Sequence, residues 1–138
     1  MSPRHELAIE GHILLVEDEE AVLEFERDVL TGAGAEVVTV MDVEDVQARM
    51  QQESFGAVII NGKMPGGWGA VEFYRWIAEK HPGMEKHLLF TFSGVADQET
   101  RAFLKQHQLP SLVKPFEVAD LISHARKLLQ KTQAAVAG

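Results

Sequence analysis

Short apolar runs that alternate with longer segments of helical period restrict the fold of this chain more than any other feature. The runs predict strands over residues 12–17, 36–40, 57–61, 87–92 and 111–113. The segments between and after them predict helices over residues 20–31, 43–53, 69–80, 97–107 and 118–130. Four of the runs are continuously apolar, as expected for parallel strands that helices cover on both faces.

Five strand–helix units in succession predict one fold class. Consecutive parallel strands need right-handed helical crossovers, and these place helices on both faces of the sheet. We therefore expect an α/β, flavodoxin-like (βα)5 doubly wound domain, whose five-stranded parallel sheet has the order 2-1-3-4-5. The domain is expected over residues 11–130, between tails of residues 1–10 and 131–138.

Apolar spacing predicts which side of a helix is buried. In the first helix the expected buried stripe is Val22, Phe25, Val29 and Leu30. In the last helix it is Leu121, Ile122, Ala125, Leu128 and Leu129. Asp42 and Asp97 are expected to cap the second and fourth helices, because an aspartate side chain can accept hydrogen bonds from the first backbone N–H groups.

Composition limits the classes of partner. The chain has 138 residues, a net charge of −8 and no cysteine. An acidic chain lacks the basic patches that bind nucleic acids and anionic membranes, so we expect neither nucleic-acid binding nor membrane contact. No apolar run approaches the roughly 20 residues of a membrane span. Together with the lack of cysteine, this favours a cytoplasmic location.

Polar residues follow the first and third predicted strands. Glu17 and Asp18 come after the first strand, and Asn61 ends the third. Because the strand order reverses between these two strands, their carboxyl ends form a ligand-binding crevice. Adjacent carboxylates repel each other unless a cation or a lysine lies nearby, and Mg²⁺ prefers carboxylate ligands. A solvated acidic turn is the structural alternative for the Glu17-Asp18 pair.

Several short motifs carry a resemblance to a known family. They are the acidic pair, Asn61 with the loop Met64-Pro65-Gly66, Ser93-Gly94, and Lys114-Pro115-Phe116. In this order they resemble the receiver (response-regulator) domain of two-component signalling over about residues 11–130. The segments 90–94 and 99–104 are similar to C-terminal receivers of hybrid sensor histidine kinases. The resemblance implies a signalling module and not an enzyme, within a parent chain that is a histidine kinase or a response regulator.

The resemblance also implies a role for each site residue. The position of Asn61 normally carries the aspartate that accepts a phosphoryl group, and Ser93 and Lys114 would contact phosphoryl oxygens. A Mg²⁺ site is implied at Glu17, Asp18, Asn61 and the backbone carbonyl of Lys63. An amide nitrogen is not a nucleophile. The formal charge of Glu17, Asp18, position 61 and Lys114 together is −2 with an aspartate at position 61 and −1 with Asn61. We therefore expect only weak Mg²⁺ binding.

Two departures from the family pattern concern switching. One is Asn61, and the other is Ser111, where many receivers carry a Tyr or Phe that swings inward on activation. The pattern predicts a pseudo-receiver that acts by contact with a histidine kinase or with other domains of its parent chain, and it leaves a homodimer open. The implied contact surfaces are the first helix and the face formed by the last strand with its two flanking helices.

Other interpretations remain open. The chain could be a phosphorylatable receiver whose aspartate at position 61 was replaced, or whose acceptor is a neighbouring carboxylate such as Asp18. Slow deamidation at Asn61-Gly62 could also restore the carboxylate, because glycine leaves the succinimide route unhindered. A flavodoxin-like cofactor binder is disfavoured, since the four acidic residues 17–20 would repel a phosphate at this position.

Overall fold

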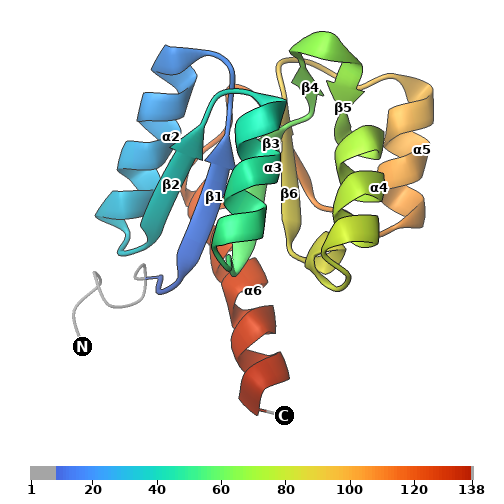
Figure 1. Ribbon diagram of the computed structural model, residues 1–138. Coiled ribbons are helices and arrows are strands. Elements are labelled where there is room, and N and C mark those ends of the chain that lie inside the picture. Colours follow the sequence, from blue (N-terminus) through green and yellow to red (C-terminus); the bar gives the residue numbers. More distant parts are fainter. Residues whose placement is uncertain (1–8, 138) are drawn as a thin grey trace.

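A parallel sheet forms the centre of the computed structural model, which describes residues 9–137 and the side chains of residues 9–131 (Figure 1). Its strands are β1 (His12–Val16), β2 (Glu36–Val40), β3 (Ala57–Asn61), β6 (Leu88–Phe92) and β7 (Ser111–Val113). They lie in the order β2-β1-β3-β6-β7, and every pair is parallel. Counted along the chain this order is 2-1-3-4-5, so the predicted flavodoxin-like fold is confirmed.

Helices cover both faces of the sheet (Figure 1). On one face lie α2 (Glu20–Gly32) and α6 (Val118–Ala137). On the other face lie α3 (Val43–Gln52), α4 (Ala70–Lys80) and α5 (Gln98–Gln106). Alternate strand residues contribute to the two cores: Ile13 and Leu15 to one, Leu14 and Val16 to the other. Both sides of β1 are therefore apolar, which explains its continuous apolar run.

A small hairpin that the sequence analysis did not predict follows β3. β4 (Lys63–Met64) pairs antiparallel with β5 (Trp68–Gly69), and the 3-10 turn η1 (Pro65–Gly67) joins them. Gly66 and Gly67 have φ angles of 84° and 83°, a region that residues with a side chain adopt only with strain. A second 3-10 turn, η2 (Met84–Lys86), precedes β6.

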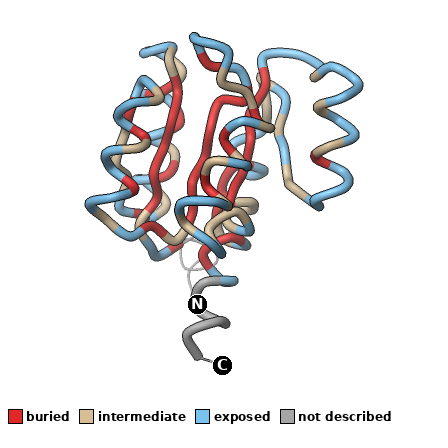
Figure 2. The backbone as a smooth tube through the Cα atoms, turned by 45° about the vertical axis from the view of Figure 1, so that its right-hand side comes forward, coloured by how far each residue is buried: buried red, intermediate tan, exposed pale blue. Residues whose placement is uncertain are grey.

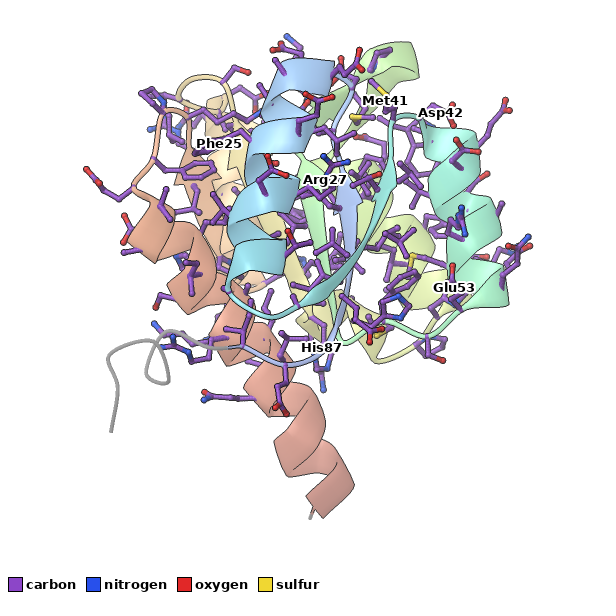
Figure 3. The ribbon with its side chains drawn as sticks, turned by 90° about the vertical axis from the view of Figure 1, so that its left-hand side faces the viewer. Phe25, Arg27, Met41, Asp42, Glu53 and His87 are labelled. Atoms are coloured by element: carbon purple, nitrogen blue, oxygen red, sulfur yellow. The ribbon has the colours of Figure 1, made fainter. Side chains whose placement is uncertain are left out.

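The buried side of α2 is only partly the predicted one: Leu30 is buried as expected and Val29 packs against the core, but the stripe is centred elsewhere. Leu23, Glu26 and Leu30 face the core and are 7%, 1% and 0% exposed, whereas Phe25 is 47% exposed. Figure 3 shows Phe25 on the side of α2 that points away from β2. Two of the buried positions lie one residue past the predicted stripe, which is a rotation of about 100° around the helix axis. The prediction was wrong because a charged residue is not expected in a core.

The predicted caps and the buried stripe of α6 are confirmed. Asp42 accepts a hydrogen bond from the N–H of Asp45 at 2.8 Å, and Asp97 accepts one from the N–H of Thr100 at 2.7 Å. All five residues of the α6 stripe are at most 9% exposed. These two aspartates fix where α3 and α5 begin.

At both ends the fold extends past the predicted domain limits. Ile9 is 3% exposed, and its N–H donates to the carbonyl of Ala33 at 2.8 Å. The first eight residues of the predicted tail 1–10 lie outside the described residues. α6 continues to Ala137, beyond the predicted helix end at residue 130. No helix within residues 9–137 is both long enough and apolar enough to span a membrane.

Candidate functional site

Glu17, Asp18 and Asn61 meet at the carboxyl edge of the sheet. β1 and β3 are neighbours with Val16 opposite Ile60, so the residues that follow these two positions emerge side by side. Glu17 is fully buried, and Asn61 is 6% exposed. The topology therefore brings together the polar residues that the sequence placed at this edge.

The side-chain amide of Asn61 lies among three oxygen atoms. Its Nδ2 atom is 2.7 Å from Asp18 Oδ1, 3.0 Å from Glu17 Oε2 and 3.2 Å from the carbonyl oxygen of Lys63. An amide nitrogen has two hydrogens to donate, so three acceptors share them. The opposite amide orientation would place a carbonyl oxygen against two carboxylates. Electrostatic repulsion therefore fixes the N–H groups toward Glu17 and Asp18.

Lys114 closes the other side of the Glu17 carboxylate. Its Nζ atom donates to Glu17 Oε1 at 2.5 Å, and the lysine side chain is 15% exposed. The Lys114–Pro115 peptide bond is cis. The N–H of Glu19 also donates to Glu17 Oε2 at 3.2 Å. Both oxygens of the buried carboxylate therefore have partners, which a charge in the protein interior requires.

Two hydroxyl residues at the end of β6 lie at different depths. Thr91 is 1% exposed and pairs with Asn61 in the sheet, whereas Ser93 follows the strand and is exposed. The carbonyl of Thr91 accepts a hydrogen bond from the N–H of Gly62 at 2.6 Å. Of these two hydroxyl groups, the one that a ligand at the sheet edge can reach is that of Ser93.

Glu26 is a buried acid near the site that the sequence analysis missed. Its Oε2 atom has no hydrogen-bond partner within the part of the chain that the structure describes. Burial raises the pKa of Glu26 to about 7, the nearby ammonium of Lys114 opposes this rise, and the carboxylate of Glu17 adds to it. The available signal was spacing, because Glu26 lies at helical intervals between Leu23 and Leu30.

The oxygen atoms around Asn61 have the composition of a magnesium site, but the atom at their centre is a nitrogen. Mg²⁺ binds carboxylate and carbonyl oxygens of the kind that Glu17, Asp18 and Lys63 present. The N–H groups of Asn61 point at the same oxygens and would repel a cation placed there. Within the described residues, no group of three or more His, Cys, Asp or Glu side chains could hold a metal ion. These residues therefore fit a cation only when the Asn61 amide turns away.

Comparison with known sequences identifies the family. The pattern of the response regulator receiver domain matches residues 13–126. The response regulator protein FleR of Pseudomonas aeruginosa is 34% identical over 110 residues, which make up 80% of this chain and 23% of FleR. The chain thus spans about a quarter of the length of that relative.

Solved structures of receiver domains have the same fold. One from Clostridium thermocellum matches with a TM-score of 0.79 and 22% identity, covering 91% of this chain and 98% of its own. A CheY-like receiver from Methanospirillum hungatei gives 0.78 and 21%, covering 93% and 99%. The receiver of a signal transduction histidine kinase from Syntrophus aciditrophicus gives 0.75 and 19%, covering 89% and 92%. The chain belongs to the response regulator receiver domain family and is a signalling module of two-component systems rather than a member of a catalytic enzyme family.

Proposed function

We propose that this receiver domain does not accept a phosphoryl group and acts by protein–protein contact. The observation that carries the proposal is the Asn61 amide, which donates hydrogen bonds to Asp18 and Glu17. The resemblance to receiver domains assigns this position to the phosphoacceptor aspartate. The nitrogen lone pair of an amide is delocalised, so this side chain offers no nucleophile to phosphorus. The rest of the site, with Ser93 and Lys114, is retained around a centre that cannot react.

The Asn61 amide also stabilises the neighbouring carboxylates of Glu17 and Asp18, as a bound cation would. Glu17 and Asp18 would repel each other and a third carboxylate at position 61. Here the N–H groups of Asn61 and the ammonium of Lys114 offset that repulsion without a metal ion. The formal charge of Glu17, Asp18 and Lys114 is −1. Mg²⁺ would have to displace the amide to bind, so its binding is weak.

Exposed apolar side chains near β7 support a contact function. Val113 on β7 is 46% exposed, and Val118 at the start of α6 is 42% exposed. β7 is an edge strand of the sheet, and its first residue, Ser111, is also exposed. The partner is a histidine kinase or another domain of the parent chain, which is itself a sensor kinase or a response regulator in the cytoplasm. The same surface is also available for contact between two copies of the chain in a homodimer.

A titration with beryllofluoride and Mg²⁺ tests the proposal. Beryllofluoride mimics a phosphoryl group on an aspartate, and backbone amide resonances of Ser93 and Gly94 would report its binding. The chain with Asn61 is expected to show no saturable shift, and Asn61→Asp is expected to show one. A saturable shift in the unchanged chain would overturn the proposal.

Asp18 is the alternative acceptor, and the same titration examines it. One oxygen of Asp18 accepts the hydrogen bond from Asn61, which lowers its availability as a nucleophile. If the unchanged chain responds, Asp18→Asn decides between the two sites. A response that disappears in Asp18→Asn would assign the chemistry to Asp18, and a response that persists would place it elsewhere.

A further inference from the structure

Helix α5 buries little of its surface against the rest of the domain. Of its nine residues, all of which the structure describes, only Leu104 is buried, at 7% exposure. In Figure 2, α5 is the helix at the right edge and is drawn mostly in the colour of exposed residues. The segment before it is also open to solvent, since Val95 is 77% exposed. A single buried leucine gives little burial of apolar surface to hold a helix in one position.

A cluster of three aromatic rings joins the carboxyl-terminal half of α5 to α4. The ring centroids of Tyr74 and Phe103 are 5.3 Å apart, and the two planes meet edge to face at 82°. His107, the residue directly after α5, has its ring centroid 4.7 Å from that of Tyr74 and 4.3 Å from that of Phe103. Arg75 adds its guanidinium over Phe103 at 6.0 Å. Each ring therefore contacts the other two, in separations typical of favourable aromatic pairs.

The side of the cluster on α4 is firmly anchored. Phe73 and Ile77, on the neighbouring face of α4, are fully buried against the sheet. Tyr74 lies between them in sequence, is partly buried against the same core and contacts Phe103 with its ring. Figure 1 shows α4 and α5 side by side, so the rings bridge adjacent helices. By contrast, the amino-terminal end of α5 follows a segment in which residues 93–95, including Ser93, are exposed.

We propose that Tyr74, Phe103 and His107 form a latch that holds α5 against α4 in one position. The latch would keep the α5 side of the face that includes β7 and α6 in a fixed arrangement. The latch rests on ring geometry alone. The test of the latch is independent of whether Asn61 or Asp18 accepts a phosphoryl group.

Native-state hydrogen exchange of the whole chain tests the latch. Tyr74→Leu removes the ring on α4 without altering the sequence of α5, and Phe103→Leu removes a ring from α5 while keeping an apolar side chain. Each is expected to speed exchange of the α5 amides roughly tenfold, while the amides of β3 and β6 stay within about twofold. Tyr74→Phe, which keeps the ring, and Lys105→Ala, at an exposed position of α5, are the matched controls and should exchange like the parent.

The double variant Tyr74→Leu/Phe103→Leu distinguishes a latch from two independent losses. If the rings act through mutual contact, the double variant should exchange about as fast as Tyr74→Leu alone, because that change already removes both ring contacts between α4 and α5. Three results would overturn the proposal. They are unchanged α5 exchange in both single variants, an equal rise in α5 and the central strands, and fully multiplicative effects in the double variant.

Discussion

The Nδ2 atom of Asn61 lies 2.7 Å from the Oδ1 atom of Asp18, and the same nitrogen donates to Glu17 at 3.0 Å. A neutral donor thus stands between two carboxylates at the carboxyl edge of the sheet. Because of this contact, the two carboxylates have partners within the protein and need no bound cation to offset their repulsion. It also fixes how the domain should respond to mutation, to divalent cations and to pH.

Replacing Asn61 by aspartate should make the stability of the domain depend on a metal ion. Asn61→Asp replaces two donated hydrogen bonds by repulsion among three carboxylates, so the free energy of unfolding should fall by about 1–3 kcal/mol without divalent cations. Mg²⁺ should restore most of this loss, whereas the unchanged chain should hardly respond. Thermal unfolding with and without Mg²⁺ measures both effects. An Asn61→Asp variant that is as stable as the parent in a chelator would contradict the role given to the amide.

Removing Lys114 should destabilise the domain strongly. Glu17 is fully buried, and Lys114 is its cationic partner at 2.5 Å. Lys114→Met leaves that carboxylate with its amide partners only, which is expected to lower stability by about 3 kcal/mol. Lys80→Met, at the exposed end of α4, is the control and should change stability by less than about 0.5 kcal/mol. Urea unfolding of the two variants gives the comparison, and equal midpoints would count against the buried ion pair.

Stability should decrease as the pH rises through the titration of Glu26. The unfolded chain loses this proton near pH 4.5, but the folded protein keeps it until about pH 7. Between these values the folded state binds more protons, so the free energy of unfolding falls with rising pH, by up to about 3 kcal/mol. Glu26→Gln cannot titrate and should gain stability relative to the parent across this window. Chemical denaturation from pH 4.5 to 8 should show the two curves diverging, and parallel curves would contradict the burial of this acid.

The fold should protect the Asn61-Gly62 bond from deamidation. Succinimide formation needs the Gly62 nitrogen to attack the Asn61 side chain. In the structure that N–H donates to the Thr91 carbonyl at 2.6 Å, while the amide is held by its own acceptors. We expect deamidation at this bond to be much slower in the native protein than in urea. Peptide mapping after parallel incubation measures it, and equal rates in both conditions would show that the fold gives no protection.

The fold could be predicted from the sequence because its signals are local and redundant. β3 and β6 are buried on both sides and read as continuous apolar runs, and Asp42 and Asp97 mark helix starts that the structure confirms. The hairpin β4–β5 could not be predicted, since strands of two residues carry no periodicity. The α2 face was partly misplaced for another reason: apolar spacing does not predict that a carboxylic acid, Glu26, is buried.

The meeting of Asn61 with Glu17 and Asp18 could be predicted from the sequence, but the contacts among these residues could not. Topology alone brings Asn61 to the acidic pair, because parallel strands end at the same edge. That the amide nitrogen would point at both Glu17 and Asp18 depends on three-dimensional electrostatics. The same holds for the pairing of Lys114 with Glu17 rather than with Asp18.

Incubation with acetyl phosphate and Mg²⁺, followed by intact mass spectrometry, tests the central claim most directly. The account predicts that the chain with Asn61 gains no phosphoryl group under conditions in which Asn61→Asp gains one. Asn61→Ala serves as the control for labelling elsewhere on the protein. A phosphoryl adduct on the unchanged chain that is stable in acid and labile in base, in a yield comparable to that of Asn61→Asp, would contradict it.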